Sequence, residues 1–177
     1  MKAKVQVVLC RCCTEMPALL NMERLQKLAA ESNNVVSVMT VDAACGGKDL
    51  GPVMNEAKEK EIDRAVVFAC HKKDISPAIV KAYRRAGVNE FLVEFVNMRE
   101  EVVLPHMSEP ERAQAKAETK MKAALIRSIM LAPLERQTEE MKTRNVVIIG
   151  AGVAGQAAAH EASKAGVHTI LLEKTGR

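Results

Sequence analysis

The sequence predicts an α/β fold in which helices cover a parallel, doubly wound sheet. Two observations predict it. Short apolar runs alternate with longer amphipathic segments through the first hundred residues. Near residue 150, another apolar run leads into a glycine-rich turn that is followed by a helical segment. Repeated strand–helix units of this kind favour parallel pairing with helices on the faces of the sheet. Hydrophobic residues make up 48% of the 177, which is enough for a sizeable core.

Four strands and three helices are expected in the first part of the chain. The strands are the apolar runs at residues 4–9, 35–41, 65–69 and 91–96. Between the first two, Thr14 is expected to cap a helix. The apolar side of this helix would carry Leu19, Met22, Leu25 and Leu28. A second helix is expected at 48–60, and a third would begin at Asp74 and end at Gly87. This is a Rossmann or flavodoxin-like pattern.

A long polar helix is expected next. Ser108 and Glu111 have the spacing of a capping box, and Pro133 would stop or kink the helix. Its apolar stripe would consist of Ala113, Ala117, Met121, Leu125 and Ile129. We therefore divide the chain into a cysteine-containing α/β domain at 1–100, a helical connector at 101–144 and a second α/β segment at 145–177.

The segment 145–177 carries a G-x-G-x-x-G turn between an apolar strand and a helix. Gly150 would allow the tight turn, Gly152 the approach of a pyrophosphate, and Gly155 close helix–strand packing. A helix opening at Val153 would aim free N–H groups at that phosphate. Glu173 closes the second strand and would accept a ribose hydroxyl. The segment is thus the truncated start of a nucleotide-binding Rossmann domain. Its apolar faces need a partner, so we expect the segment to add to the first sheet, to pair with a second copy of the chain, or to stay poorly ordered.

Composition excludes several classes of protein. The net charge is only +4, no block of basic residues stands out, and one Tyr and three Phe leave little to stack on bases, so nucleic-acid binding is disfavoured. No apolar run reaches membrane length. The first apolar run, at 5–10, is too short for a signal peptide. We therefore expect a cytoplasmic protein without membrane insertion.

Four of the five cysteines follow predicted strands. Cys10 lies at the carboxyl end of the first strand with Cys12 two residues beyond it, Cys45 lies in the loop after the second, and Cys70 closes the third. In a parallel sheet these positions share the carboxyl edge, where open α/β sheets bind ligands. Four thiolates gathered there suit an iron–sulfur cluster better than zinc, because the paired C-x₂-C spacing of zinc ribbons is absent.

The same thiols have a second interpretation. Cysteine is among the most buried residue types, so Cys10 and Cys70 could be inert core residues at the ends of apolar strands. Zinc binding and thiol redox chemistry also stay open. Cys13 is either a spare thiol or an alternative ligand.

As a set, these motifs resemble the N-terminal part of the heterodisulfide reductase A-subunit family, which comprises iron–sulfur flavoproteins of anaerobic electron transfer. The resemblance rests on several segments in order. They are Val7–Cys12, Cys45 with Gly46, Val66–Cys70, Asn97–Glu100, His106, Pro110, Ala115–Ala117, Leu131–Glu135 and the glycine turn. The chain departs from the family pattern at Cys13 and at His71 and Lys72, beside the expected cluster.

The resemblance implies an oxidoreductase subunit. Cys10, Cys12, Cys45 and Cys70 would be the metal ligands of a 4Fe–4S cluster, and Gly150, Gly152, Gly155 and Glu173 the first contacts of FAD in a full-length context. The partners would be other subunits of a heterodisulfide-reductase-like or hydrogenase- or formate-linked redox complex. A metal-free docking module that joins the flavin subunit to its partners is the alternative. A small flavin oxidoreductase acting alone is a third possibility, against which the truncated glycine segment argues.

Overall fold

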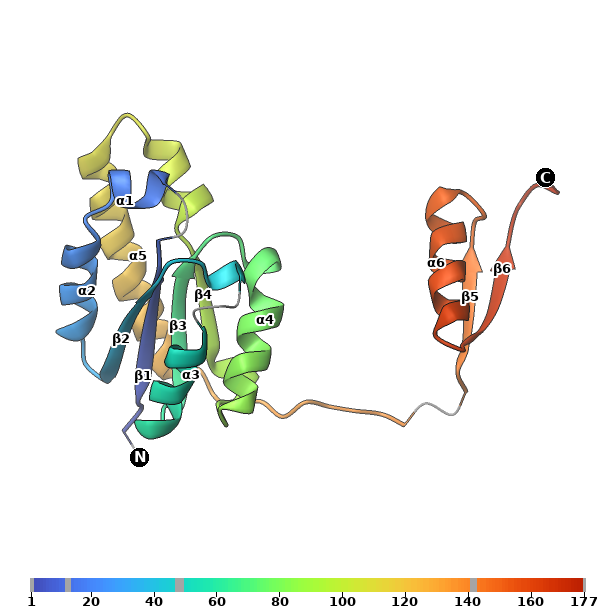
Figure 1. Ribbon diagram of the computed structural model, residues 1–177, viewed down its shortest axis with the longest axis horizontal. Helices are drawn as coiled ribbons and strands as arrows, with labels where there is room; N and C mark the ends of the chain where they lie inside the picture. The colour runs from blue at the N-terminus through green and yellow to red at the C-terminus, as the bar shows by residue number, and fades with distance from the viewer. Residues whose placement is uncertain (1, 12–13, 47–49, 141–142, 177) are drawn as a thin grey trace. The chain divides into compact units, whose positions relative to one another are not determined.

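The computed structural model describes residues 2–11, 14–46, 50–140 and 143–176, without the side chains of residues 46 and 72–76. The chain divides into two compact units, Met1–Leu134 and Glu135–Arg177. Each unit is described by itself (Figure 1). No helix in the described ranges is both long and apolar enough to cross a membrane.

The first unit is built on a sheet of four parallel strands. These are β1 (Val5–Cys10), β2 (Val35–Val41), β3 (Arg64–Ala69) and β4 (Val93–Asn97). They lie in the order β2-β1-β3-β4. The chain therefore winds outward in both directions from β1 and β3, and the predicted α/β fold with a parallel sheet is confirmed.

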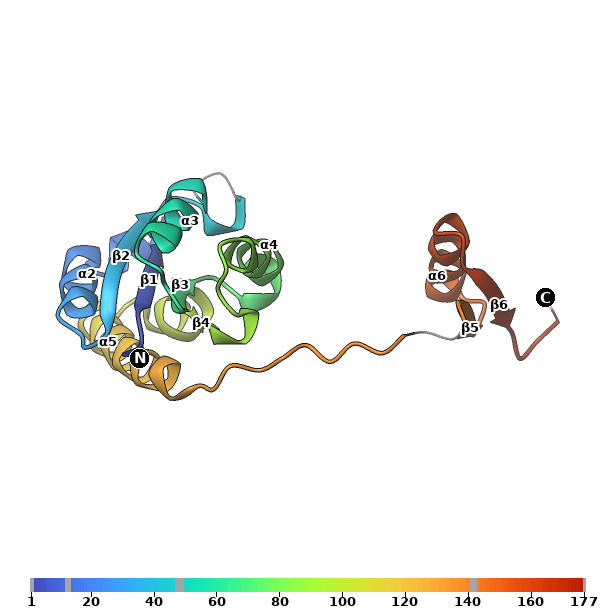
Figure 2. The same ribbon diagram turned by 90° about the horizontal axis from the view of Figure 1, so that it is seen from below.

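Helices cover both faces of this sheet (Figure 2). One face carries α2 (Met22–Ala30) and α5 (Pro110–Met130), and the other carries α3 (Leu50–Glu59) and α4 (Lys72–Arg85). Short elements complete the unit. They are α1 (Glu15–Leu19), η1 (Ala44–Gly46), η2 (Glu90–Leu92), the π-helical turn η3 (Arg99–Val103) and η4 (Leu104–His106).

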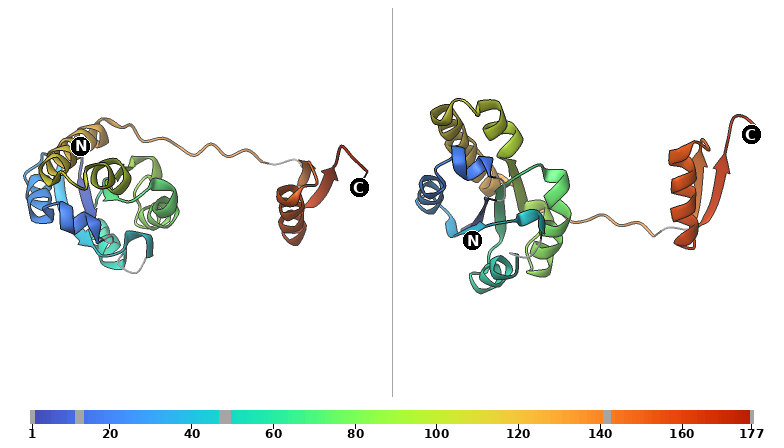
Figure 3. Two further views of the ribbon diagram at one scale, coloured as in Figure 1. Left: turned by 90° about the horizontal axis from the view of Figure 1, so that it is seen from above. Right: turned by 45° about the horizontal axis from the view of Figure 1, so that its top comes forward.

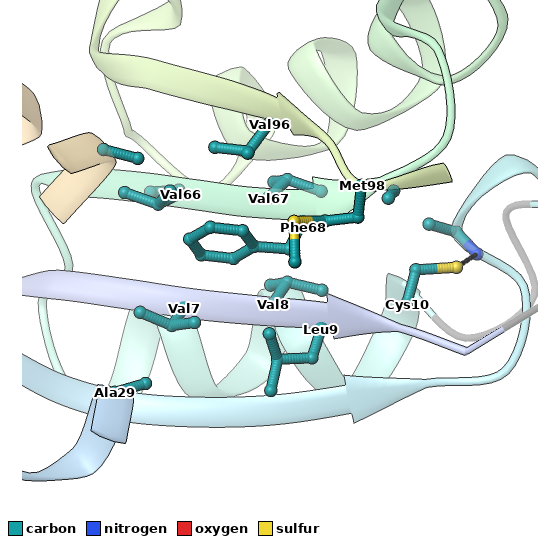
Figure 4. Packing of buried hydrophobic residues seen from close by; sticks show 14 of the residues in the cluster. Val7, Val8, Leu9, Cys10, Ala29, Val66, Val67, Phe68, Val96 and Met98 are labelled. Atoms are coloured by element: carbon teal, nitrogen blue, oxygen red, sulfur yellow. Dashed lines mark hydrogen bonds between the residues drawn. The ribbon is translucent and has the colours of Figure 1, made fainter. Parts of the chain in front are cut away.

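The core centres on β1 and β3, because these two strands have neighbours on both sides and helices on both faces. Central strands of parallel sheets read as continuous apolar runs, as 7–9 and 65–69 do. Phe68 is only 2% exposed and packs among the valines of both strands (Figure 4). One polar chain crosses the core. The Tyr83 hydroxyl donates to Gln6 Oε1 at 2.7 Å, and Gln6 Nε2 donates to the Val53 carbonyl at 3.2 Å.

The long helix α5 packs against β3 and β4 within the first unit. Arg64 at the start of β3 holds its C-terminal end, since Nη1 donates to the carbonyls of Ser128 and Leu131 at 2.7 Å each. Gln114 Oε1 accepts the Asn21 N–H at 2.8 Å nearer the other end. The segment expected as a connector, 101–144, thus includes a helix that is integral to the first unit.

Two details of the expected helices were wrong. The single helix after Thr14 is split into α1 and α2, and the Thr14 side chain caps nothing. Asn21 interrupts the helix instead, because its side chain accepts the Arg24 N–H at 2.9 Å and so caps α2.

The capping box at Ser108 and Glu111 is also wrong. Helix α5 begins one residue later than that pattern requires, with Glu109 at the N-cap and no side-chain cap hydrogen bond. Pro110 occupies the first helical position, where its fixed φ favours helix initiation. Of the expected apolar stripe, Ile129 is 38% exposed and the other four residues are buried.

The second unit is a single strand–helix–strand unit. It consists of β5 (Asn145–Ile149), α6 (Val153–Lys164) and β6 (His168–Leu172), with the two strands parallel (Figure 3). Several of its apolar side chains are exposed, including Val147 at 55% and Ile149 at 86%. A two-stranded sheet is at best marginally stable in water. The unit therefore depends on something further to cover its apolar surface.

Candidate functional site

The glycine turn between β5 and α6 has the geometry that its sequence predicts. Gly150 has φ +100°, a left-handed conformation that favours glycine, and its N–H donates to the Leu172 carbonyl at 2.7 Å. A Cβ on Gly155 would lie 1.8 Å from the Gly150 carbonyl oxygen. The first glycine thus makes the turn, and the last lets α6 lie directly against it.

Gly152 leaves room in front of α6. It is the N-cap residue, it has no side chain that could cap the helix, and a Cβ built on it would meet nothing within 4 Å. The first N–H groups of a helix have no partner within the helix and carry the positive end of its dipole. This end of α6 is therefore open to an anion, and the three glycines fit the pyrophosphate of a dinucleotide.

Glu173 follows β6 and reaches the same turn. Its carboxylate accepts the N–H groups of Ala151 at 2.6 Å, of Lys174 at 2.6 Å and of Thr175 at 3.2 Å. The Ala151 hydrogen bond is the largest of the causes that hold the pKa of Glu173 below its ordinary value of 4.5. The side chain is therefore anionic at neutral pH and ties the end of β6 to the glycine turn. Sequence reasoning assigned Glu173 to a ribose and missed this structural contact.

The cysteines expected as ligands follow three neighbouring strands of the first unit. Cys10 is the last residue of β1, Cys70 directly follows β3, and Cys45 lies in η1 after β2. Strands β1 and β3 are also where the winding of the sheet reverses, and ligands bind outside the carboxyl ends of the strands at such a point. The structure therefore places three of the four expected ligands at the carboxyl edge.

These thiols do not by themselves make a metal site. Cys10 is buried, and its Sγ accepts the Ala44 N–H at 3.4 Å (Figure 4), whereas Cys45 is exposed. Within the described ranges, no three Cys, His, Asp or Glu side chains form a group that could hold a metal ion. Cys12 and Cys13 lie outside the described residues. The described residues alone therefore do not fit a four-thiolate cluster.

Sequence reasoning placed Arg11 near this edge but missed its pairing with Asp42. Arg11 directly follows β1, and its Nε lies 2.5 Å from the Oδ1 of Asp42, which directly follows β2. This hydrogen bond raises the pKa of Arg11 above its ordinary value. Residues just beyond neighbouring parallel strands meet at one edge, which is the rule used above for the cysteines. The same rule would have found this pair.

Comparisons with known proteins bear on both units. Residues 145–177 match the family described as FAD binding domain. A protein of Archaeoglobus profundus that is named as similar to the heterodisulfide reductase A subunit is 32% identical over 171 residues, which are 97% of this chain and 24% of that protein. The A subunit of the H(2):CoB-CoM heterodisulfide,ferredoxin reductase of Methanothermobacter marburgensis is 32% identical over 171 residues, with 97% of this chain and 26% of that protein covered.

A third relative has a name that mentions iron and sulfur. It is one of the iron-sulfur A subunits of the CoB–CoM heterodisulfide reductase of Methanopyrus kandleri, and it is 31% identical over 172 residues, which are 97% of this chain and 25% of that protein. The chain thus spans about a quarter of the length of the curated relatives it matches.

Proposed function

Because this chain is related over nearly its whole length to the A subunits of heterodisulfide reductases, we propose that it is part of an electron-transfer flavoprotein subunit. Its residues 145–177 would hold the adenosine diphosphate half of FAD. The observation that carries the proposal is the close approach of α6 to the glycine turn, because a Cβ on Gly155 would lie 1.8 Å from the Gly150 carbonyl oxygen. This contact leaves the N-terminus of α6 facing the position that a pyrophosphate would occupy.

Each residue of the turn has a distinct role in this proposal. Gly150 turns the chain, Gly152 gives the pyrophosphate access to the backbone, and Gly155 seats the helix. The Glu173 carboxylate would accept a ribose hydroxyl through lone pairs that its backbone hydrogen bonds leave available. The flavin ring supplies the conversion between one-electron and two-electron steps when FAD is bound. These residues bind and orient the cofactor, and its enclosure requires parts outside this segment.

The pH dependence of this contact follows from Glu173. A hydroxyl donates best to the ionised carboxylate, and the backbone hydrogen bonds keep the pKa of Glu173 below 4.5. The contribution of this contact is therefore present throughout the neutral range. It is lost only as the pH falls through the lowered pKa.

We predict that FAD shifts the amide NMR signals of residues 150–155 and 173–175, whereas riboflavin, which lacks the pyrophosphate and adenosine, does not. Glu173→Gln is expected to weaken FAD binding about tenfold, because a hydrogen bond to a charged acceptor is replaced by one to a neutral acceptor. The matched control is Glu161→Gln, because Glu161 is an exposed glutamate of α6 whose carboxylate pairs with Lys164. Equal shifts with riboflavin, or equal affinities for the two variants, would contradict the assignment.

A finer proposal concerns the first unit. We propose that Cys10, Cys12, Cys45 and Cys70 bind a 4Fe–4S cluster in the assembled protein. The support is the position of three of these thiols at the carboxyl edge, together with the iron–sulfur name of a relative. The Ala44 N–H bonded to Cys10 Sγ is the kind of contact that sets the potential of such clusters. The site would need Cys12 and a rearrangement of Cys45.

Anaerobic reconstitution with iron and sulfide tests this proposal. We expect about four irons and four sulfides per chain and absorbance near ~400 nm. The Cys45→Ser variant should lose most of this iron. The control variant Ala115→Ser, at an exposed position of α5, should retain it. A colourless chain with unchanged folding after reconstitution would support the metal-free docking module instead.

The partners also belong to this proposal. The relatives are subunits of heterodisulfide reductases by name. By analogy, this chain would work with other subunits of a heterodisulfide-reductase-like or hydrogenase- or formate-linked redox complex.

A further inference from the structure

A groove of about 410 Å³ lies between α3 and α4, on one face of the first unit. Small and apolar side chains form its floor. They are Leu50, Gly51, Met54, Ala78, Ala82 and Ala86. Three of these are alanines and one is glycine, so another backbone can approach the two helices closely. The groove is thus suited to an elongated apolar object.

Three cations stand along the groove. Lys58 lies on α3, and Lys81 and Arg85 lie on α4, and all three are exposed. The described lining of the groove contains no acidic residue. Lys81 and Arg85 are four residues apart, which places them one above the other on the same face of α4. The groove therefore combines an apolar floor with a row of positive charge.

These cations differ from their immediate neighbours. Lys60 is paired with Glu56 at 2.6 Å, and Arg84 is paired with Glu90 at 3.9 Å. Lys58, Lys81 and Arg85 have no carboxylate within ion-pair distance among the described residues. Lys60 and Arg84 thus have acidic partners, whereas the three cations of the groove have none in the described part of the chain. Their exposed charges are therefore available to a binding partner.

We infer that this groove docks an acidic, amphipathic helix of a partner protein. Apolar side chains of that helix would lie on the floor, and carboxylates one turn apart would face Lys81 and Arg85, with another facing Lys58. Such charge complementarity speeds encounter and selects the partner. The inference uses only residues of the first unit, so it stands or falls separately from the FAD assignment.

The probe is a synthetic helical peptide with leucines on one face, flanked by glutamates. A second peptide has glutamine at every glutamate. We expect the acidic peptide to shift the NMR signals of Leu50, Met54 and Ala82, the glutamine peptide to shift them much less, and added salt to weaken the effect. No shift with the acidic peptide, or equal shifts with the glutamine peptide, overturns the inference.

Charge reversal locates the contact. The triple variant Lys58→Glu, Lys81→Glu, Arg85→Glu is expected to bind the acidic peptide about tenfold more weakly or worse. The control reverses three exposed cations elsewhere, in Lys2→Glu, Lys27→Glu, Lys122→Glu, and so has the same net charge. Tyr83, the only tyrosine of the chain, reports by its fluorescence that both variants are folded. Equal weakening of peptide binding in both variants overturns the inference. NMR shifts with ATP that equal those with the acidic peptide would also overturn it, because they would indicate a site for small anions.

Discussion

The Gly155→Ala variant is expected to lose the folded second unit and with it the FAD contact. A methyl group at this position would lie 1.8 Å from the Gly150 carbonyl oxygen and 3.0 Å from its carbon. Both are backbone atoms of a turn that the Gly150 φ of +100° already constrains, so α6 itself must move. Overpacking of this kind costs about 3 kcal/mol, which outweighs the roughly 1 kcal/mol that alanine gains over glycine in a helix. A two-stranded unit has little stability to lose.

Gly152→Ala is the matched control, because a Cβ there meets nothing within 4 Å and its φ of −66° suits any residue. This variant should keep the protection of β5 and β6 amides against hydrogen exchange, whereas Gly155→Ala should lose it. In FAD binding the control is no longer neutral. Gly152→Ala is also expected to bind more weakly, because its methyl group occupies the approach of the pyrophosphate. Unchanged amide protection in Gly155→Ala would show that the helix can shift at little cost.

The glycine turn was predictable because its geometry is local. The positions of Gly150 and Gly155 in the strand–turn–helix pattern predict both the tight turn and the close approach, and both are found. The contact of Glu173 with Ala151 was not predicted, since it depends on the register that places the end of β6 beside the turn. Local pattern thus predicts backbone conformation better than it predicts the partners of a side chain.

The helices of the first unit show the same limit. The apolar spacing after Thr14 predicts one helix, but Asn21 interrupts it. Its side chain caps α2, and its own N–H donates to Gln114, which lies 93 residues further along the chain. The packing of α5 onto β3 likewise depends on Arg64 reaching the carbonyls of Ser128 and Leu131. Contacts between distant parts of the chain contribute to both outcomes, and the apolar spacing does not reveal them.

The cysteines illustrate what topology can and cannot predict. Parallel strand order predicts that Cys10, Cys45 and Cys70 follow strands that end at one edge, and they do. It does not predict side-chain direction. Cys10 lies buried against the Ala44 N–H whereas Cys45 is exposed, and loop conformation rather than strand order sets that difference.

Phe68→Ala is expected to destabilise the first unit by about 3–5 kcal/mol, the usual cost of removing a fully buried phenylalanine. Phe68 is 2% exposed and lies on β3, in the buried cluster that also contains Val7, Val66 and Met98 at the centre of the sheet (Figure 4). The cavity would lie between central strands whose positions are fixed by pairing on both sides, so the surrounding structure can close it only partly. Strands β1 and β3 also carry Cys10 and lead to Cys70, so the carboxyl edge should lose order together with the core.

Denaturant unfolding followed by Tyr83 fluorescence measures this loss in the first unit alone, because the chain has one tyrosine and no tryptophan. The matched control is Phe91→Ala, since Phe91 is 41% exposed and lies in η2 at the surface. That substitution should change the free energy of unfolding by less than about 1 kcal/mol. If the two variants unfolded at the same denaturant concentration, β3 would not be the centre of the core. A large loss of the free energy of unfolding in Phe68→Ala, without one in Phe91→Ala, would show that packing on β1 and β3 supplies most of the stability of this unit.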